Sequence, residues 1–595
     1  MKKTSVKYLI FAICALLLLG TTGLARETNV PSEPLVVPLG EPDEFWEMDD
    51  LAPGKPGGEV KYSTEKFPGT FNDLLGREPD TKDVTKMIMG AGLVDENPVN
   101  GKLVPAFAKS WSLSDDGRVY TFHLRTGLKF SDGRPLTAED VAFTYEELVF
   151  NPKVKTERRA ILRIGGELPK VTVVDRYTIK FEITEPHGPF LRRLSTGIYP
   201  KHELKDVTGE EFNDTWNREF AANNPENIVG AGPFRLDEFV PGEKIILSRN
   251  PYYYKVDPRG TQLPYLERYK ILKVKDNDVE FLKFRSGETD FLRPQIRDMP
   301  YLLSHADEEG WNLLEGDGTR SAPLNADFVT FNWNTEEGHL KELFREPDFR
   351  RAVFLAIDLE EIINRVFNGF GRPQYGPISR LSPYHNPEVG NLLPVEPDPE
   401  SARKLLGELG LKDRDGDGVR ETASGDPISF SILVNEENRV RAGSARIITR
   451  NLADLGLEVE VETVQFDNYT SKLVNGNYQS TIASVLANSR EPSTLSDVFT
   501  SGGPLHLWNR GQNRTLTEWE KEIDRLFTKG LQAGSFEERK EYYDKFQSIY
   551  AEQLPVIYLA GESFLYATAP SIRNWQEFNR LGTFLDFAEF IWLGK

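Results

Sequence analysis

The amino-acid sequence predicts an α/β protein that folds as two or more lobes. The first observation is length: at about 100–200 residues per domain, 595 residues are too many for one hydrophobic core. The second is composition, because 39% hydrophobic and 11% aromatic residues suit large buried cores and not a disordered chain. The third is the alternation of strand-like and helix-like patterns from about Gly58 onwards, without a repeat of fixed length.

The clearest unit is a strand, a helix and a second strand between residues 428 and 461. Apolar residues at every second position indicate the first strand: Ile428, Phe430, Ile432 and Val434. Residues 442–455 follow with helical spacing, and residues 457–461 alternate between apolar residues and glutamates. This order predicts two parallel strands joined by a right-handed crossover.

Two other helices are indicated by their ends. Asp398 can cap a helix that has Pro399 at its first position and ends at Gly410. A second helix is predicted to run without a break from near Pro347 to Gly369, because apolar residues recur along it with helical spacing.

The segment between residues 111 and 150 predicts a strand, a turn and a helix. Residues 119–124 look like a strand, and Ser131-Asp132-Gly133 looks like a turn. Thr137 then begins a helix, with Asp140 as the acid of a capping box. By position alone these residues explain folding and not activity.

The start of the chain reads as a secretory signal peptide, residues 1–25. Three lysines precede the apolar run from Leu9 to Leu19, and Gly23-Leu24-Ala25 forms a small-x-small cleavage site. The run is shorter than the ~20 residues that span a bilayer, so we expect cleavage near Ala25 and export to the periplasm. Residues 26–57, rich in proline and acidic residues, read as an extended leader.

Charge and motif content exclude several classes of function. A net charge of −20 without a basic block argues against nucleic acid as a partner, because binding phosphates requires clustered Lys and Arg. One cysteine, Cys14 in the signal, permits neither a disulfide nor a cysteine zinc site. Histidine metal motifs, a nucleophile elbow, a P-loop and a dinucleotide fingerprint are all missing from the sequence. A secreted glycosidase stays open as an alternative, since its two carboxylates need no local motif.

One acidic segment could hold calcium. Asp413, Asp415 and Asp417 alternate as in the first half of a calcium loop, but the twelfth position is Ser424 instead of glutamate, and Glu421 is at the ninth. We favour a solvated turn between a helix and a strand and expect no metal site, although the sequence leaves calcium binding open.

Two of the nine tryptophans are candidates for stacking on a ligand. Trp333 and Trp508 lie in polar stretches, whereas most tryptophans are core residues. Stacking of this kind suits sugars and peptide side chains.

Several segments, taken together, resemble the family 5 extracellular solute-binding proteins of ABC importers, the oligopeptide- and dipeptide-binding type. The most specific are Ala108-Lys109-Ser110-Trp111, Ser114-Asp115-Asp116-Gly117, Tyr120-Thr121-Phe122, Phe130-Ser131-Asp132-Gly133 and Leu136-Thr137-Ala138-Glu139-Asp140-Val141. Others are Gly230-Ala231-Gly232-Pro233-Phe234, Arg249-Asn250-Pro251-Tyr252, Leu263-Pro264-Tyr265-Leu266, Ser286-Gly287-Glu288-Thr289-Asp290 and Phe349-Arg350-Arg351-Ala352. They follow the family's order along the chain.

The resemblance implies an α/β fold of two lobes with a hinge and an additional subdomain, as in periplasmic binding proteins. Lobe I would comprise residues 58–80, 230–322 and 555–595, lobe II residues 323–554, and the added subdomain residues 81–229. Such proteins close around a solute and dock on a membrane permease. The resemblance thus implies a monomer that is not an enzyme, with no cofactor, whose partners are the solute and an ABC transporter permease.

For ligand contacts the resemblance points to residues 485–492, where a family aspartate pairs with the terminal ammonium of a bound peptide. Here Asn488 stands at that position, with Ala487, Arg490 and Glu491 beside it. An amide brings no charge, and an unpaired buried ammonium costs on the order of several kcal/mol. Either Glu491 takes the role or the ligand lacks a free amino terminus, so a peptide is the leading expectation and an oligosaccharide the rival.

The resemblance also places ligand contacts just after the first strand. Thr64 and Glu65, which follow Ser63, stand there. An ordinary turn between strand and loop explains these residues equally well.

Replacing Asn488 by aspartate tests this alignment. Asn488→Asp should strengthen the binding of peptides with a free amino terminus, because the new carboxylate pairs with the ammonium. Isothermal titration calorimetry measures the affinity. An unchanged affinity would discredit the placement of Asn488.

Overall fold

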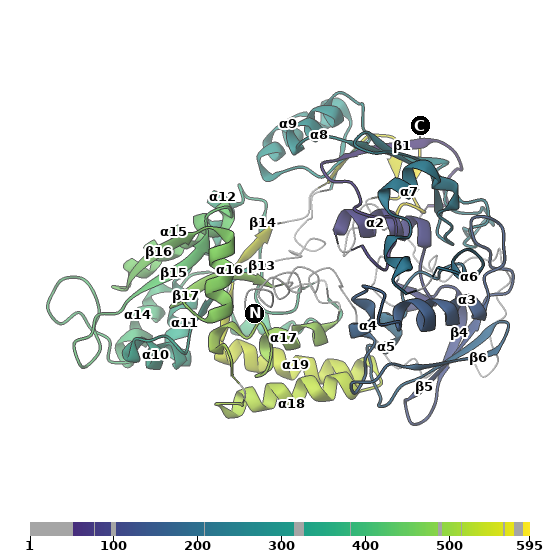
Figure 1. Cartoon of the computed structure of the whole chain (residues 1–595). Helices are drawn as coiled ribbons and strands as arrows, with labels where there is room; N and C mark the ends of the chain where they lie inside the picture. The colour runs from purple at the N-terminus through teal and green to yellow at the C-terminus, as the bar shows by residue number, and fades with distance from the viewer. Residues whose placement is uncertain are drawn as a thin grey trace. The chain divides into compact units, whose positions relative to one another are not determined.

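Each of two units in the chain is built on its own mixed β-sheet (Figure 1). The computed structural model describes residues 52–594 except 77, 97–102, 208, 315–325, 381, 395, 486–490, 513, 563–565 and 576–586. Of these, unit 1 holds the residues within Gly316–Leu531 and Glu537–Phe564, and unit 2 those within Thr22–Glu315, Gln532–Phe536 and Leu565–Lys595. The predicted signal peptide, and the leader up to Leu51, lie outside the described residues.

Unit 1 is organised by a five-stranded sheet. Its order is β16 (Glu458–Val464), β15 (Ser429–Asn435), β17 (Ser480–Val485), β13 (Ala326–Phe331) and β18 (Val556–Tyr558). β15 pairs in parallel with β16 and β17, whereas β13 is antiparallel to β17 and β18. Figure 1 shows the helices around this sheet: α10 (Gly338–Arg345), α11 (Pro347–Ala356), α12 (Leu359–Val366), α14 (Pro399–Glu408), α15 (Arg439–Ala453), α16 (Phe466–Asn475), α18 (Glu518–Gln532) and α19 (Phe536–Gln553).

The predicted strand–helix–strand unit is confirmed as β15, α15 and β16. Asn438 caps α15, its side chain accepting a hydrogen bond from Arg441 N at 3.0 Å. The core beneath this sheet is aromatic, since the rings of Phe331, Phe349 and Phe430 meet edge to face, at centroid distances of 5.5–6.5 Å, and all three residues are buried. Each such pair is worth about 0.5–1.5 kcal/mol beyond its buried area.

The helix expected from Pro347 to Gly369 is two helices, so the prediction of a continuous helix is wrong. α11 ends at Ala356 and α12 begins at Leu359. Asp358 makes the break, because its side chain accepts from Glu361 N at 2.8 Å and caps the second helix. The helix predicted from Pro399 is confirmed as α14, with Asp398 accepting from Ser401 N at 3.0 Å.

Unit 2 contains a seven-stranded sheet. The order is β12 (Asn312–Leu314), β20 (Tyr566–Thr568), β11 (Phe291–Leu292), β1 (Glu59–Thr64), β10 (Arg268–Lys273), β9 (Lys244–Arg249) and β8 (Phe234–Val240). β1 is parallel to both β10 and β11, and the other pairs are antiparallel. Of the three segments expected to form lobe I, residues 58–80 and 230–322 place their described strands in this sheet, whereas residues 555–595 contribute only β20. In that last segment, β19 (Ala560–Glu562) pairs with β14 (Gly371–Pro373), and β21 (Ile572–Arg573) pairs with β22 (Trp592–Leu593). β18, within residues 555–564, joins the sheet of unit 1 through its pairing with β13.

Residues 81–229, expected to form an added subdomain, lie within unit 2 and carry a sheet of their own. It is antiparallel, in the order β4 (Ala108–Leu113), β5 (Val119–Leu124), β7 (Thr178–Glu182) and β6 (Lys170–Asp175). Helix α3 (Ala138–Phe143) begins where predicted, with Asp140 Oδ2 accepting from Thr137 N at 2.9 Å. Asp140 Oδ1 also accepts from Lys201 N at 3.1 Å and so holds the start of α6 (Lys201–Leu204).

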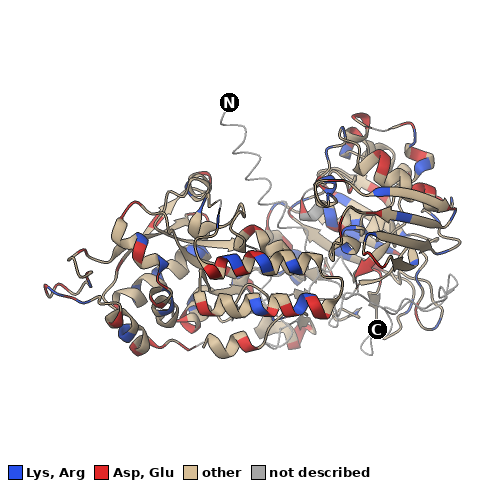
Figure 2. Ribbon diagram, turned by 90° about the horizontal axis from the view of Figure 1, so that it is seen from below, with Lys and Arg blue, Asp and Glu red and all other residues tan. Residues whose placement is uncertain are grey.

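In the view of Figure 2, positions of Lys and Arg and positions of Asp and Glu are interspersed along the ribbon. Among the described residues, no helix combines the length and the apolar character that crossing a bilayer requires.

A buried lysine links three distant segments of unit 2. Lys255 Nζ lies 3.1 Å from Asp95 Oδ2 and 3.0 Å from Glu589 Oε1, and its side chain is 1% exposed. Tyr253 donates its hydroxyl proton to the other oxygen of Glu589. The cluster joins β2 (Val94–Glu96) and the C-terminal segment to the loop after β9.

We expect Lys255→Met to lower the free energy of unfolding by about 3–5 kcal/mol, because it leaves buried carboxylates without a counter-ion. Urea denaturation measures the loss. The matched control is Lys275→Met, since that side chain is 80% exposed and pairs only at the surface; it should change stability by less than about 0.5 kcal/mol. Equal effects of the two substitutions would show that the Lys255 cluster stabilises nothing.

Candidate functional site

The carboxyl ends of parallel strands form one edge of the sheet in unit 1. β15 ends at Asn435 and β17 at Val485, and Ala326, which begins β13, pairs with Val485. Ligands of open α/β sheets bind outside such edges. Residues 486–490 continue directly from β17. Three predicted ligand contacts, Ala487, Asn488 and Arg490, fall in this segment and lie outside the described residues.

A pair of charges marks this edge. Arg441 Nε donates to Asp327 Oδ1 at 2.9 Å and Nη1 donates to Asn435 Oδ1 at 3.3 Å, while the guanidinium lies 5.8 Å from the centre of the Tyr469 ring. The side chains of Arg441 and Asp327 are only 14% and 12% exposed. Burial alone lowers the pKa of Arg441, but the charge of Asp327, the nearby Tyr469 and the hydrogen bond to Asp327 together raise it above its usual value. The pair is a fixed dipole near the end of β17, where Asp327 pairs with Ser484.

Asp327 and Arg441 are not among the site residues predicted from the sequence. Arg441 stands in the first turn of the helix after a parallel strand, and this position could have indicated it. Asp327 could not be found in this way, because nothing in the sequence shows that β13 lies beside β17.

Unit 2 has a comparable edge, where β1 ends at Thr64, β10 at Lys273 and β11 at Leu292. Thr64 is buried, and its hydroxyl accepts from Lys66 N at 3.2 Å while its carbonyl accepts from Val274 N at 3.0 Å. Glu65 is exposed. Thr64 therefore closes a turn, and ligand contact by Thr64 and Glu65 stays a prediction.

Trp333 and Trp508 lie together, at the edge of the unit 1 sheet opposite Val485. Phe331, the last residue of β13, pairs with Ser480 at the start of β17, and Trp333 N donates to Trp508 O at 2.7 Å. At about 3.3 Å per residue, the length of β17 separates Trp333 from Val485 by about 16 Å. The structure thus does not bring the tryptophans to the edge that leads into the 486–490 segment.

The two indoles are core residues. Trp333 is 2% exposed and Trp508 0%, and both Nε1 atoms lack a hydrogen-bond partner among the described residues. Trp333 packs against Trp519 and under the guanidinium of Arg350, which lies 5.0 Å from its ring centre. Packing explains why these tryptophans are large and aromatic; stacking on a ligand stays a prediction that the described contacts do not support.

Glu491 forms a buried ion pair with Arg539. It is 0% exposed, Oε1 accepts from Arg539 Nη2 on α19, and Arg539 Nε donates to Gly530 O at 2.9 Å. Burial alone lowers the pKa of Arg539, but the charge of Glu491 and its hydrogen bond, together with Tyr384 and Tyr543, raise it above its usual value. Glu491 Oε1 also accepts from Ser493 N at 3.2 Å and so caps the short helix Pro492–Leu495. Its charge is already neutralised by Arg539.

The acidic segment from Asp413 to Glu421 is the turn between α14 and β15, as favoured from the sequence. Asp413 accepts from Gly416 N at 2.7 Å and Gly418 N at 3.1 Å, and Glu421, which is buried, accepts from Arg414 N at 2.8 Å. Four carboxylates of this turn, Asp413, Asp415, Asp417 and Glu421, lie within 4.8 Å of one another. The backbone contacts account for Asp413 and Glu421 without an ion.

Residues 102–505 match the family described as bacterial extracellular solute-binding proteins, family 5 Middle. This is more than half of the chain, which therefore belongs to the family 5 extracellular solute-binding proteins, the solute-binding components of ABC importers. The predicted family is confirmed.

Two curated relatives cover most of the chain. The oligopeptide-binding protein AppA of Bacillus subtilis strain 168 is 28% identical over 515 residues, 85% of this chain and 87% of AppA. The periplasmic alpha-galactoside-binding protein of Rhizobium meliloti strain 1021 is 28% identical over 548 residues, 88% of this chain and 78% of the relative. Among solved structures, an oligopeptide-binding protein OppA matches with a TM-score of 0.77 at 24% identity, covering 95% of this chain and 93% of OppA. This match confirms the predicted α/β, two-lobed fold class.

Removing the charge of Glu491 tests its structural role. Glu491→Gln should lower the free energy of unfolding by about 3–5 kcal/mol, because Arg539 is left buried and unpaired. The double variant Glu491→Gln with Arg539→Met should recover part of that loss. Glu518→Gln is the control, since Glu518 has a side chain 93% exposed.

Urea denaturation of the parent, of the single variants Glu491→Gln and Arg539→Met, and of the double variant gives the coupling energy between Glu491 and Arg539. A variant Glu491→Gln that keeps full stability but binds peptides more weakly would contradict this account and assign Glu491 to the ligand.

Proposed function

We propose that this protein captures a peptide in the periplasm and delivers it to the membrane permease of an ABC importer. The observation that carries the proposal is membership of family 5 together with a fold in which each unit presents the carboxyl ends of parallel strands. In this proposal the chain is exported by a signal peptide cleaved near Ala25, acts as a monomer, uses no cofactor and leaves its ligand unchanged.

A peptide is favoured over a sugar because the two candidate stacking tryptophans are buried in the core of unit 1. A sugar site needs flat aromatic faces open to the ligand. The candidates for such faces are Trp333 and Trp508, and both are buried by packing within unit 1. A peptide can instead be bound as an added strand, through main-chain hydrogen bonds that require no particular side chain.

The second candidate ligand is an oligosaccharide. The Rhizobium meliloti relative is named as an alpha-galactoside-binding protein and is as similar to this chain as AppA. In addition, the family resemblance places Asn488 at the position of the ammonium-binding aspartate, and Glu491 is paired with Arg539. We propose that a ligand without a free ammonium, either a sugar or a peptide bound by its backbone, suits these residues better than a strongly charged amino terminus.

Thermal-shift screening separates the ligands. A bound ligand at 100 times its dissociation constant adds about 2.7 kcal/mol to stability and should raise the melting temperature by about 2–5 °C in a protein of this size. We expect this rise with pools of peptides. A rise with oligosaccharides alone would exclude the peptide and support the second candidate.

N-acetylated copies of the binding peptides sharpen the experiment. With Asn488 uncharged and Glu491 neutralised by Arg539, acetylation should change the affinity by less than about tenfold. A larger loss would show that a carboxylate of this chain holds the ammonium. Incubation with oligosaccharides followed by chromatography tests the remaining alternative, because hydrolysis would identify a glycosidase.

A further inference from the structure

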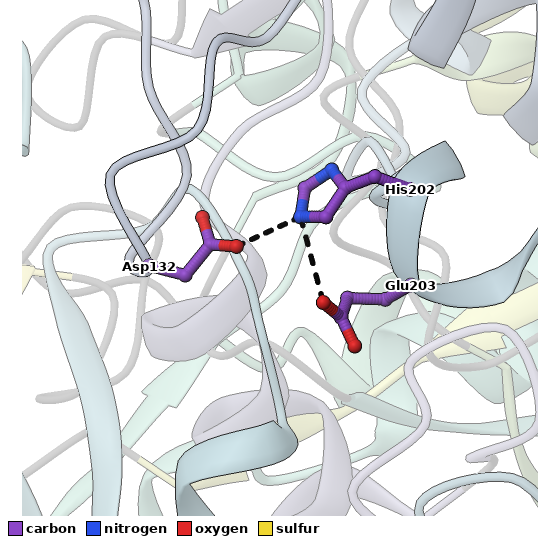
Figure 3. A group of neighbouring side chains, drawn as sticks. All are labelled: Asp132, His202 and Glu203. Carbon is purple, nitrogen blue, oxygen red and sulfur yellow. Dashed lines mark hydrogen bonds and ion pairs between the residues drawn. The ribbon is translucent and has the colours of Figure 1, made fainter.

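Asp132, His202 and Glu203 bring three potential metal ligands together in unit 2 (Figure 3). His202 Nε2 lies 2.8 Å from Asp132 Oδ2 and 3.8 Å from Glu203 Oε1, and the three ligand atoms lie within 4.8 Å of one another. Asp132 comes from the turn before α3, and the other two residues from α6, 70 residues later in the chain. A search for metal motifs with short spacing cannot find this group.

The turn that carries Asp132 is held by its own hydrogen bonds. Asp132 Oδ1 accepts from Arg134 N at 3.0 Å, Gly133 N donates to Phe130 O at 2.9 Å, and Ser131 N donates to Gly230 O at 2.8 Å. Gly133 has φ 85°, a conformation that favours glycine. The turn therefore uses Oδ1 for its own backbone and directs Oδ2 toward the imidazole.

The imidazole is also positioned by its surroundings. The ring of Phe130 packs edge to face against His202 at a centroid distance of 5.6 Å. The start of α6 is fixed by the hydrogen bond from Lys201 N to Asp140. His202 and Asp132 are partly buried, with side chains 20% and 23% exposed, while Glu203 is 36% exposed. Two of the three donors are thus preorganised, and the third reaches them from the surface.

The local charges favour a multivalent cation. One imidazole N–H can donate to only one of the two carboxylates that face it. Arg134 lies 3.8 Å from Asp132 and 4.0 Å from Glu203, beyond hydrogen-bond distance, and its side chain is 59% exposed. Lys201, which is also near, pairs with Glu139 at 2.8 Å. The negative charges of Asp132 and Glu203 are therefore only weakly compensated by the exposed guanidinium of Arg134.

We propose that Asp132, His202 and Glu203 bind a divalent transition-metal ion, of which Zn²⁺ is the best match. One imidazole and two carboxylates form the mixed nitrogen and oxygen set that Zn²⁺ accepts, at about 2.0–2.2 Å from each donor, with water at the open position. Ca²⁺ and Mg²⁺ prefer oxygen-only shells. The ion replaces Arg134 between the carboxylates and joins the turn 131–133 to α6.

The test is zinc titration of the full mature chain, stripped of metal with a chelator, by isothermal titration calorimetry. The background carries Asp413→Asn and Asp415→Asn, so that the acidic turn of unit 1 contributes no competing site. We expect one zinc ion per chain, a higher melting temperature with zinc, and an affinity at least tenfold lower in His202→Ala and in Asp132→Asn. Co²⁺ should give a visible absorption band that His202→Ala removes.

Two further variants make the result specific. His305→Ala is the matched control, because that imidazole stacks on Tyr301 at 4.0 Å and belongs to no cluster of metal-ligating groups found among the described residues; it should bind zinc as the parent does. Arg134→Ala should bind zinc several-fold more tightly, since it removes the competing cation. The proposal is overturned if the parent shows no binding at about 0.1 mM zinc, or if His202→Ala binds as tightly as the parent.

Discussion

Ion pairs between distant parts of the chain hold the buried charges of this protein. The packing of segments within each unit depends on these pairs. In unit 2, Lys255 joins Asp95 to Glu589, which is 334 residues away from it. In unit 1, Arg441 holds Asp327 and Arg539 holds Glu491. A buried charge without its partner costs several-fold more than the pair contributes, so each pair selects one arrangement of its segments. The chain has no second cysteine with which a disulfide could do the same.

Strand pairing explains why the units are built from separate segments. β1 is completed on one side by β10 and on the other by β11, and β20, from near the C-terminus, extends the same sheet. In unit 1, β18 returns to pair with β13. In both units the parallel strands end at one edge of the sheet. Because the chain belongs to family 5, this arrangement of strands is that of a solute-binding fold.

Local signals in the sequence predicted local structure well. The alternation in 428–434 and 457–461 predicted β15 and β16, and the caps at Asp398 and Thr137 predicted two helix starts, because strand periodicity and capping depend on neighbouring residues alone. The one helix boundary that was missed, at Asp358, carries a cap inside an apolar pattern that continues across it. The apolar spacing at this point favours one continuous helix, whereas the cap at Asp358 favours a new helix start. In the structure α11 ends at Ala356 and α12 begins after the cap.

By itself, the sequence determined the family, the α/β class and the order of the main elements, since these follow from short motifs and from periodicity. Only the tertiary structure decided which side chains meet. It buried Trp333 and Trp508 in polar stretches that suggested exposure, paired Glu491 with Arg539, and brought Asp132 to His202 across 70 residues. The physical reason is that burial and ion pairing depend on which segments pack together, and packing between segments far apart in the chain leaves no local pattern in the sequence.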